Sequence, residues 1–185
     1  MSGHLPPTDA GRDFPHTRWS VVLAATQNSS PESAAALEII CKAYWYPLYA
    51  YVRRCGYSPH DAQDLAQEFF CRLLDKSWLA TADREKGRLR TFLIVALKNF
   101  MAKEWRKVSA QRRGGAKTHV PLDTVFAESR YAADPASSLN ADHVFDRQWA
   151  LTLLDLTLER LRSEYSASGK LTDFEVLKEC LMAAR

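Results

Sequence analysis

Apolar residues recur at helical spacing along residues 61–74, which read DAQDLAQEFFCRLL. They fall at i, i+3, i+4, i+7, i+8, i+11 and i+12, the positions that share one face of an α-helix. Ser58 followed by Pro59, with an acid three residues after Ser58, is typical of a capped helix start. The pattern therefore predicts an amphipathic helix with these core-facing residues: Ala62, Leu65, Ala66, Phe69, Phe70, Leu73 and Leu74.

The segment before it has the same spacing of apolar residues. Ser30 and Pro31 form another start signal, and Gly56 ends the pattern. Pro47 lies inside this predicted helix, where it should kink the helix or remove one hydrogen bond. A shorter helix is predicted before it, over TRWSVVLAATQ, with Thr17 as its cap.

The second half of the chain also has helical patterns. Residues 90–113 are predicted to be helical up to a Gly-Gly pair, and a long helix is predicted from about Asn140 to Ala167. Two apolar stripes on that long helix predict burial on more than one side. Gly169 should end it, and a last helix follows.

No segment has a convincing strand pattern, so we expect an all-α fold, a helical bundle with a long C-terminal helical extension. Small polar residues and prolines indicate a linker with short helical pieces at 116–141. The predicted organisation is a flexible leader at 1–16, a helical domain at 17–115, this linker, and the extension at 142–185.

Charge is distributed unevenly along the 185 residues. Of the 25 Lys and Arg and the 22 Asp and Glu, residues 83–117 hold eleven and three, a net charge of +8. The remainder carries −5, which gives the overall +3. A basic segment in an otherwise acidic chain is typical of contact with a polyanion.

Motifs for catalysis or metal binding are not apparent. The sequence has no Gly-rich phosphate loop, no H-E-x-x-H and no clear nucleophile motif, so we expect no enzyme activity, no cofactor and no metal. No run reaches 18 apolar residues, which argues against a membrane span. The four cysteines, of which Cys180 is the last, form no C-x-x-C pair. Three fall on apolar stripes, and we expect them to be small core residues in a reducing compartment: Cys41, Cys55 and Cys71.

The polar side of segment 61–74 is acidic, and capping explains only part of it. Asp61 and Asp64 lie in the first turns, where acids suit the helix dipole. Glu68 lies in the third turn, too far in for that effect. The acidic side is therefore a candidate surface for a basic partner.

Aromatic residues are interleaved with the bases of the basic segment. Bases that contact phosphates, mixed with aromatics that stack on bases, are typical of single-stranded nucleic-acid binding. Phe92 and Phe100 could equally be core residues, whereas Trp105 is expected to be partly exposed.

Three segments in this order resemble region 2 of bacterial sigma-70 family sigma factors. YWYPLYAYVRRCGYS resembles region 2.1, and DAQDLAQEFFCRLL resembles the D-A-E-D-L-x-Q-E-x-F-x-R-L-L stretch of region 2.2. RLRTFLIVALKNFMAKEWRK resembles the F-R-x-W-L-x-x-I-A-x-N stretch of regions 2.3 and 2.4. The similarity is strong over about residues 35–113, weaker over 140–180, and nearest to the extracytoplasmic-function (ECF) type.

The resemblance implies a role for each surface. The region 2.2 helix of the family docks on the basic clamp coiled coil of the RNA polymerase β′ subunit, which implies binding by Asp61, Asp64, Gln67 and Glu68. A pocket for a flipped base of the promoter −10 element would be lined by Asn99, Phe100, Met101 and Ala102. Contacts to the DNA backbone, or stacking, would come from Arg88, Arg90, Lys98, Lys103, Trp105, Arg106, Lys107, Arg112 and Arg113.

The implied partners are core RNA polymerase and the non-template single strand of promoter DNA. Many such factors are held inactive by an anti-sigma factor, which is a further candidate partner. Nothing after Gly115 resembles the helix-turn-helix of region 4, so we expect a fragment whose helical extension leads towards an absent region 4.

Two alternatives stay open. The chain could be a regulatory protein–protein interaction module that uses the acidic helix without contacting DNA. It could also be a helical DNA-binding domain of a more general kind.

Overall fold

A computed structural model describes residues 19–26, 30–74, 76–79, 81–82, 88–110, 124–133 and 139–183. The helices are α1 (Trp19–Thr26), α2 (Pro31–Arg54), α3 (Pro59–Leu74), α4 (Lys76–Leu79), α5 (Leu89–Ala110), α6 (Thr124–Ala132), α7 (Ala141–Ala167) and α8 (Leu171–Ala183). Within these ranges there is no strand, and the predicted all-α fold is confirmed. The predicted leader at 1–16 and the cap at Thr17 lie outside the described residues.

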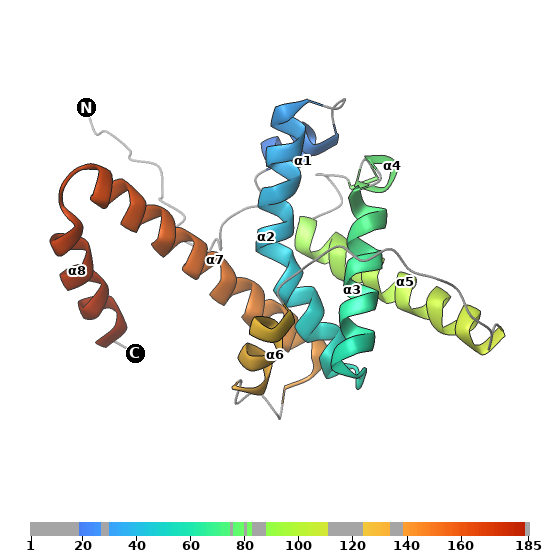
Figure 1. Cartoon of the computed structure of the whole chain (residues 1–185). Coiled ribbons are helices and arrows are strands. Elements are labelled where there is room, and N and C mark those ends of the chain that lie inside the picture. The colour runs from blue at the N-terminus through green and yellow to red at the C-terminus, as the bar shows by residue number, and fades with distance from the viewer. Residues whose placement is uncertain are drawn as a thin grey trace, which may run out of the picture.

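Helix α2 is the centre of a bundle, with α1, α3, α6 and α7 packed along it (Figure 1). Its predicted start is confirmed, because the Ser30 side chain accepts a hydrogen bond from the Ser33 backbone N–H at 3.2 Å. The helix continues past Pro47 as one element, with the proline ring buried. Gly56, at φ +93°, then turns the chain into α3, as a residue without a Cβ does readily.

Helix α3 buries the face that its sequence predicts. The Ser58 hydroxyl accepts from the Asp61 N–H at 3.2 Å and donates to the Asp61 carboxylate at 2.7 Å, which fixes the start of the helix. Phe69 lies at the centre of the core, with its ring 5.5 Å from that of Trp78 and 5.8 Å from that of Phe100 in α5. The buried side chains of this face are Ala62, Ala66, Phe69, Phe70 and Leu73.

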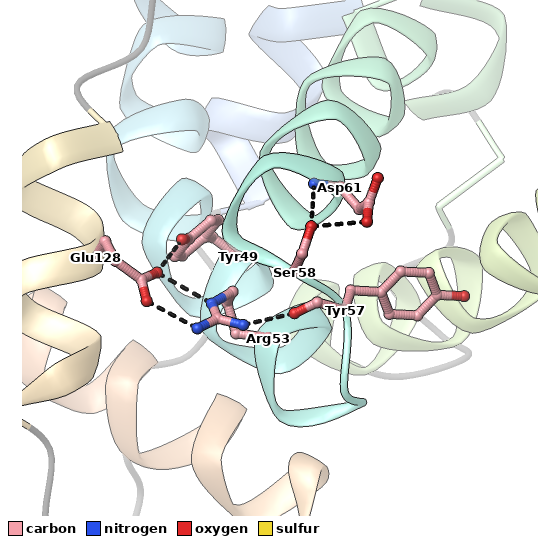
Figure 2. A network of polar contacts seen from close by, with 6 residues as sticks. All are labelled: Tyr49, Arg53, Tyr57, Ser58, Asp61 and Glu128. Atoms are coloured by element: carbon pink, nitrogen blue, oxygen red, sulfur yellow. Dashed lines mark hydrogen bonds and ion pairs between the residues drawn. The ribbon is translucent and has the colours of Figure 1, made fainter.

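The predicted linker at 116–141 contains helix α6, which is held against α2 by a polar network (Figure 2). Arg53 donates to the Glu128 carboxylate from Nε at 3.0 Å and from Nη2 at 2.7 Å, and the Tyr49 hydroxyl donates to the same carboxylate. Arg53 also donates to the Tyr57 carbonyl, so one guanidinium joins α6 to the α2–α3 turn. The hydrogen bonds that Arg53 donates hold the pKa of Glu128 below its usual range.

Helix α7 has two different halves. Asn140 caps its start by accepting from the His143 N–H at 2.9 Å, and Phe145 and Trp149 pack against α2. Its distal half and α8 leave the bundle as an antiparallel hairpin (Figure 1). The predicted burial on two sides is wrong for this half, because Leu154 and Leu161 stay exposed.

The prediction of core cysteines holds only in part. All four cysteines are unpaired, and Cys41 is half-buried, with its pKa raised by burial to about 11. Cys55 is the C-cap of α2 and is exposed, and so are Cys71 and Cys180. None of the described helices is both long and apolar enough to cross a membrane.

Candidate protein and nucleic-acid interfaces

The acidic side of α3 consists of three carboxylates that already have local partners. Asp61 is bound by Ser58 at the start of the helix. Asp64 lies 3.9 Å from His60 Nδ1, and Glu68 forms a 2.7 Å ion pair with Arg72 one turn further on. The three follow one another along the same side of the helix. Asp61 is exposed and the Glu68 side chain is 35% exposed, whereas the Asp64 side chain is only 14% exposed, so a basic partner reaches Asp61 and Glu68 more readily than Asp64.

Gln67 does not belong to this surface, which corrects its assignment to polymerase binding. Gln67 is only 6% exposed, and its Nε2 has no hydrogen-bond partner among the residues that the structure describes. The position follows Ala66 and lies one turn before Phe70, at the margin of the apolar stripe, and this spacing could have been recognised in the sequence. Its burial makes Gln67 part of the packing between helices, although an amide without a hydrogen-bond partner is costly to bury.

Arg72 joins α3 to α5, a role that the sequence interpretation missed. Its Nη2 donates to Glu68 at 2.7 Å and to Glu104 at 2.9 Å. Its guanidinium lies over the Phe100 ring, 4.6 Å from the centroid. The i, i+4 spacing of Glu68 and Arg72 indicates the first contact, but no local pattern indicates the contact with Glu104.

The four residues proposed for the −10 pocket do not share a surface. Asn99 and Ala102 are exposed on α5, whereas Phe100 is 1% exposed and Met101 is 9% exposed. The core alternative holds for Phe100, which packs against Phe69. The pocket assignments of Phe100 and Met101 are therefore wrong for this conformation, because neither side chain can reach a base.

The exposed end of α5 combines bases with an aromatic ring. Lys103 and Arg106 are exposed, and Trp105 is 67% exposed, in agreement with the expectation for this residue. Arg106 Nε donates to the Ala102 carbonyl at 3.1 Å, which keeps its side chain along the helix. This strip can supply phosphate contacts and one stacking platform.

The other predicted DNA-backbone residues are placed differently. Arg88 is exposed just before α5, but Arg90 and Lys98 pair with acids of α7. Lys107 lies in α5 with its side chain outside the described part, and Arg112 and Arg113 lie outside the described residues. Among the residues that are described, no group of three or more His, Cys, Asp or Glu side chains could hold a metal ion.

Residues 42–111 match the family model of Sigma-70 region 2. The matched range contains all of α3 and α5 and the three segments that resemble regions 2.1 to 2.4. This part of the chain, which includes the second half of α2, is therefore similar to Sigma-70 region 2. Comparison with curated proteins and with solved structures found no match.

Proposed function

We propose that this chain is a sigma factor of the ECF type, which binds core RNA polymerase and the promoter −10 element in the cytoplasm. The observation that supports this best is the pairing of two surfaces of opposite charge inside the matched range. The acidic side of α3 carries Asp61, Asp64 and Glu68, and the exposed end of α5 carries Lys103, Trp105 and Arg106.

Such a protein needs no catalytic group of its own. Unpairing and unstacking a base costs a few kcal/mol. Stacking on an aromatic side chain returns about 1–3 kcal/mol per base, and each phosphate contact adds a salt-dependent term. The protein captures the open state of the promoter, and polymerase carries out the synthesis.

The acidic side of α3 is the proposed dock for the basic coiled coil of the polymerase clamp. Because Glu68 is already held by Arg72 at 2.7 Å, a basic partner has to share or replace that contact. Asp61 has a weaker competitor, a serine hydroxyl. We therefore expect the first turn of α3 to be engaged first.

The docking surface is tested with the variant Asp64→Asn/Glu68→Lys and purified bacterial core polymerase. We expect binding at least about tenfold weaker, because an attractive charge is removed and another is reversed at a polar interface. The matched control is Glu159→Gln/Glu164→Lys, which changes the net charge equally and also breaks an i, i+4 ion pair, that of Glu164 with Arg160. Equal binding by both variants would show that α3 is not the docking surface.

The nucleic-acid surface is tested separately with single-stranded −10 oligonucleotides. Lys103→Gln/Arg106→Gln should weaken binding and flatten its salt dependence by about 0.7 in log–log slope for each phosphate that is no longer neutralised. Trp105→Ala should weaken binding with little change of the slope, because stacking carries no net charge.

A protein–protein interaction module is the second candidate function, and the burial of Phe100 and Met101 favours it. In that case the acidic side of α3 binds a protein partner and α5 contacts no DNA. Polymerase binding that depends on Asp64 and Glu68, with no oligonucleotide binding at any salt concentration, would support this function over the first.

A further inference from the structure

Two of the α5 bases are covered by acids from the first turns of α7. Lys98 Nζ lies 2.8 Å from Asp142 Oδ1 and donates to Asp142 Oδ2 at 3.0 Å. Arg90 Nη1 lies 3.3 Å from Asp146 Oδ1. The acids are one helical turn apart on α7 and the bases two turns apart on α5, and each base meets its own acid.

Each of these bases also faces an aromatic ring. Lys98 Nζ lies 5.9 Å from the centroid of the Tyr51 ring, and the Arg90 guanidinium lies 4.9 Å from that of the Trp149 ring. Both rings are buried, so each cation is held at the surface between an apolar ring and a carboxylate. A phosphate oxygen could take the place of the carboxylate at each cation without disturbing the ring contact.

We propose that Asp142 and Asp146 form an electrostatic cover that competes with nucleic-acid phosphates for Lys98 and Arg90. The cover lowers the affinity of the α5 face for single-stranded DNA, and DNA binding exchanges the carboxylates for phosphates. This inference rests on the proposed nucleic-acid binding by α5 and concerns its regulation from the same chain.

The exchange requires only side chains to move. The side chain of Asp142 is 55% exposed and that of Asp146 is 51% exposed, so both can turn into solvent. Helix α7 itself is fixed to α2 by the buried side chains of Phe145 and Trp149. Helices α5 and α7 meet through these side chains rather than through close backbone packing. The cover can therefore open while the fold stays intact.

The size of the effect follows from counterion release. Each phosphate neutralised on a single strand contributes about −0.7 to the log–log slope of affinity against salt. Removal of both acids should therefore steepen the slope by up to about 1.4, because in the unaltered chain each displaced carboxylate takes up a salt cation and offsets the cation released from the phosphate. Between 1 M and 0.1 M salt, a slope difference of about 0.7 corresponds to about fivefold tighter binding for each cation.

The test compares Asp142→Asn/Asp146→Asn with the unaltered chain, using a fluorescein-labelled single-stranded oligonucleotide of about 12 nucleotides. Anisotropy is titrated at several salt concentrations. The matched control is Glu159→Gln/Glu164→Gln, which removes two charges from the exposed distal part of the same helix. We expect tighter binding and a steeper slope for the first variant only. If the double variant unfolds at a lower temperature than the unaltered chain, Asp146→Asn alone is tested instead, because Asp146 lies beyond the first turn of α7.

A double-mutant cycle then tests the route of the effect. If Asp142 acts through Lys98, the gain from Asp142→Asn should disappear in a Lys98→Gln background. Persistence of the gain in that background would overturn the inference, because Asp142 would then act through the overall electrostatic potential of the protein and not through Lys98.

The other outcomes separate this inference from the proposed function. Binding that Lys103→Gln/Arg106→Gln weakens but Asp142→Asn/Asp146→Asn leaves unchanged would overturn the cover alone. Equal gains for the α7 variant and its control would also overturn it. No binding by any of these chains would overturn the proposed function and the cover together.

Discussion

The bundle around α2 and the hairpin of distal α7 with α8 carry apolar residues at the same helical spacing but bury them differently. In the bundle, Phe69 and Leu93 are completely buried. In the hairpin, Leu161, Val176 and Leu177 stay exposed, and Phe174 is the one large apolar side chain buried among the described residues of α8.

The difference lies in the neighbours of each helix. Helix α3 packs against α2, α4 and α5, whereas α7 is the one helix that packs extensively against α8 within the described part. Hydrophobic stabilisation grows with the apolar area removed from water. An apolar stripe therefore shows which residues share a face, and the tertiary structure decides whether that face is covered.

The largest effect is expected for Phe69→Ala in the bundle. Phe69 is fully buried among three aromatic rings, so its truncation should lower the free energy of unfolding by about 3–5 kcal/mol. Urea unfolding followed by circular dichroism measures it. The matched variant Phe174→Ala should instead speed amide exchange within α8 and leave the bundle's midpoint unchanged. A comparable global loss for both variants would mean that the hairpin and the bundle unfold as one unit.

A smaller effect is expected for Glu128→Gln, which weakens the tie between α6 and the bundle. Helix α6 is held by polar contacts, and Arg53 would lose the charge of its partner while only 18% exposed. We expect a loss of about 1–2 kcal/mol at neutral pH. Glu164→Gln is the control, since it breaks an exposed pair on the hairpin and should cost less than about 0.5 kcal/mol.

The same pair predicts a pH dependence. The pKa of Glu128 is lowered from its ordinary value of 4.5 by Arg53, so folding favours the charged carboxylate. That contribution is fully present above pH 4.5 and is lost as the pH falls through the folded-state pKa. The melting-temperature difference between the unaltered chain and Glu128→Gln should therefore be constant above about pH 5 and shrink below it. A difference that grew in acid would contradict this assignment.

The smallest effect is expected for Val176→Ser, at an exposed position of α8. Its side chain is 58% exposed, so we expect a change within about 0.5 kcal/mol in thermal unfolding. Val52→Ser, at a fully buried position of α2, is the matched substitution and should be clearly destabilising. A large effect at Val176 would indicate that the α8 face is covered in solution.

The sequence predicts the local features of this fold well because each depends on a few neighbouring residues. The caps at Ser30 and Ser58, the buried face of α3 and the turn at Gly169, with φ +69°, are all found. The burial of single residues was harder to decide, as Gln67 and Phe100 show. Spacing places Gln67 at the margin of an apolar stripe and Phe100 on one, but contacts between helices decide that both side chains are covered.

Contacts between distant segments could not be predicted in the same way. The pairs Arg53–Glu128 and Lys98–Asp142 join residues 75 and 44 positions apart, and no motif relates them. The contacts of Lys98 with Asp142 and of Arg90 with Asp146 divide the basic residues of α5 into a covered group and an exposed group. The resemblance to region 2 assigned the same DNA-contact role to both groups, because it depends on sequence position and not on the exposure of each side chain.

Arg72 has a consequence for the two proposed surfaces taken together. Its guanidinium is shared by one acid of α3 and one acid of α5, and it lies on a buried ring. Rotation of α3 about its axis relative to α5 would break this junction. The acidic and basic surfaces therefore keep a constant separation and orientation, so a molecule bound at one surface is positioned relative to whatever is bound at the other.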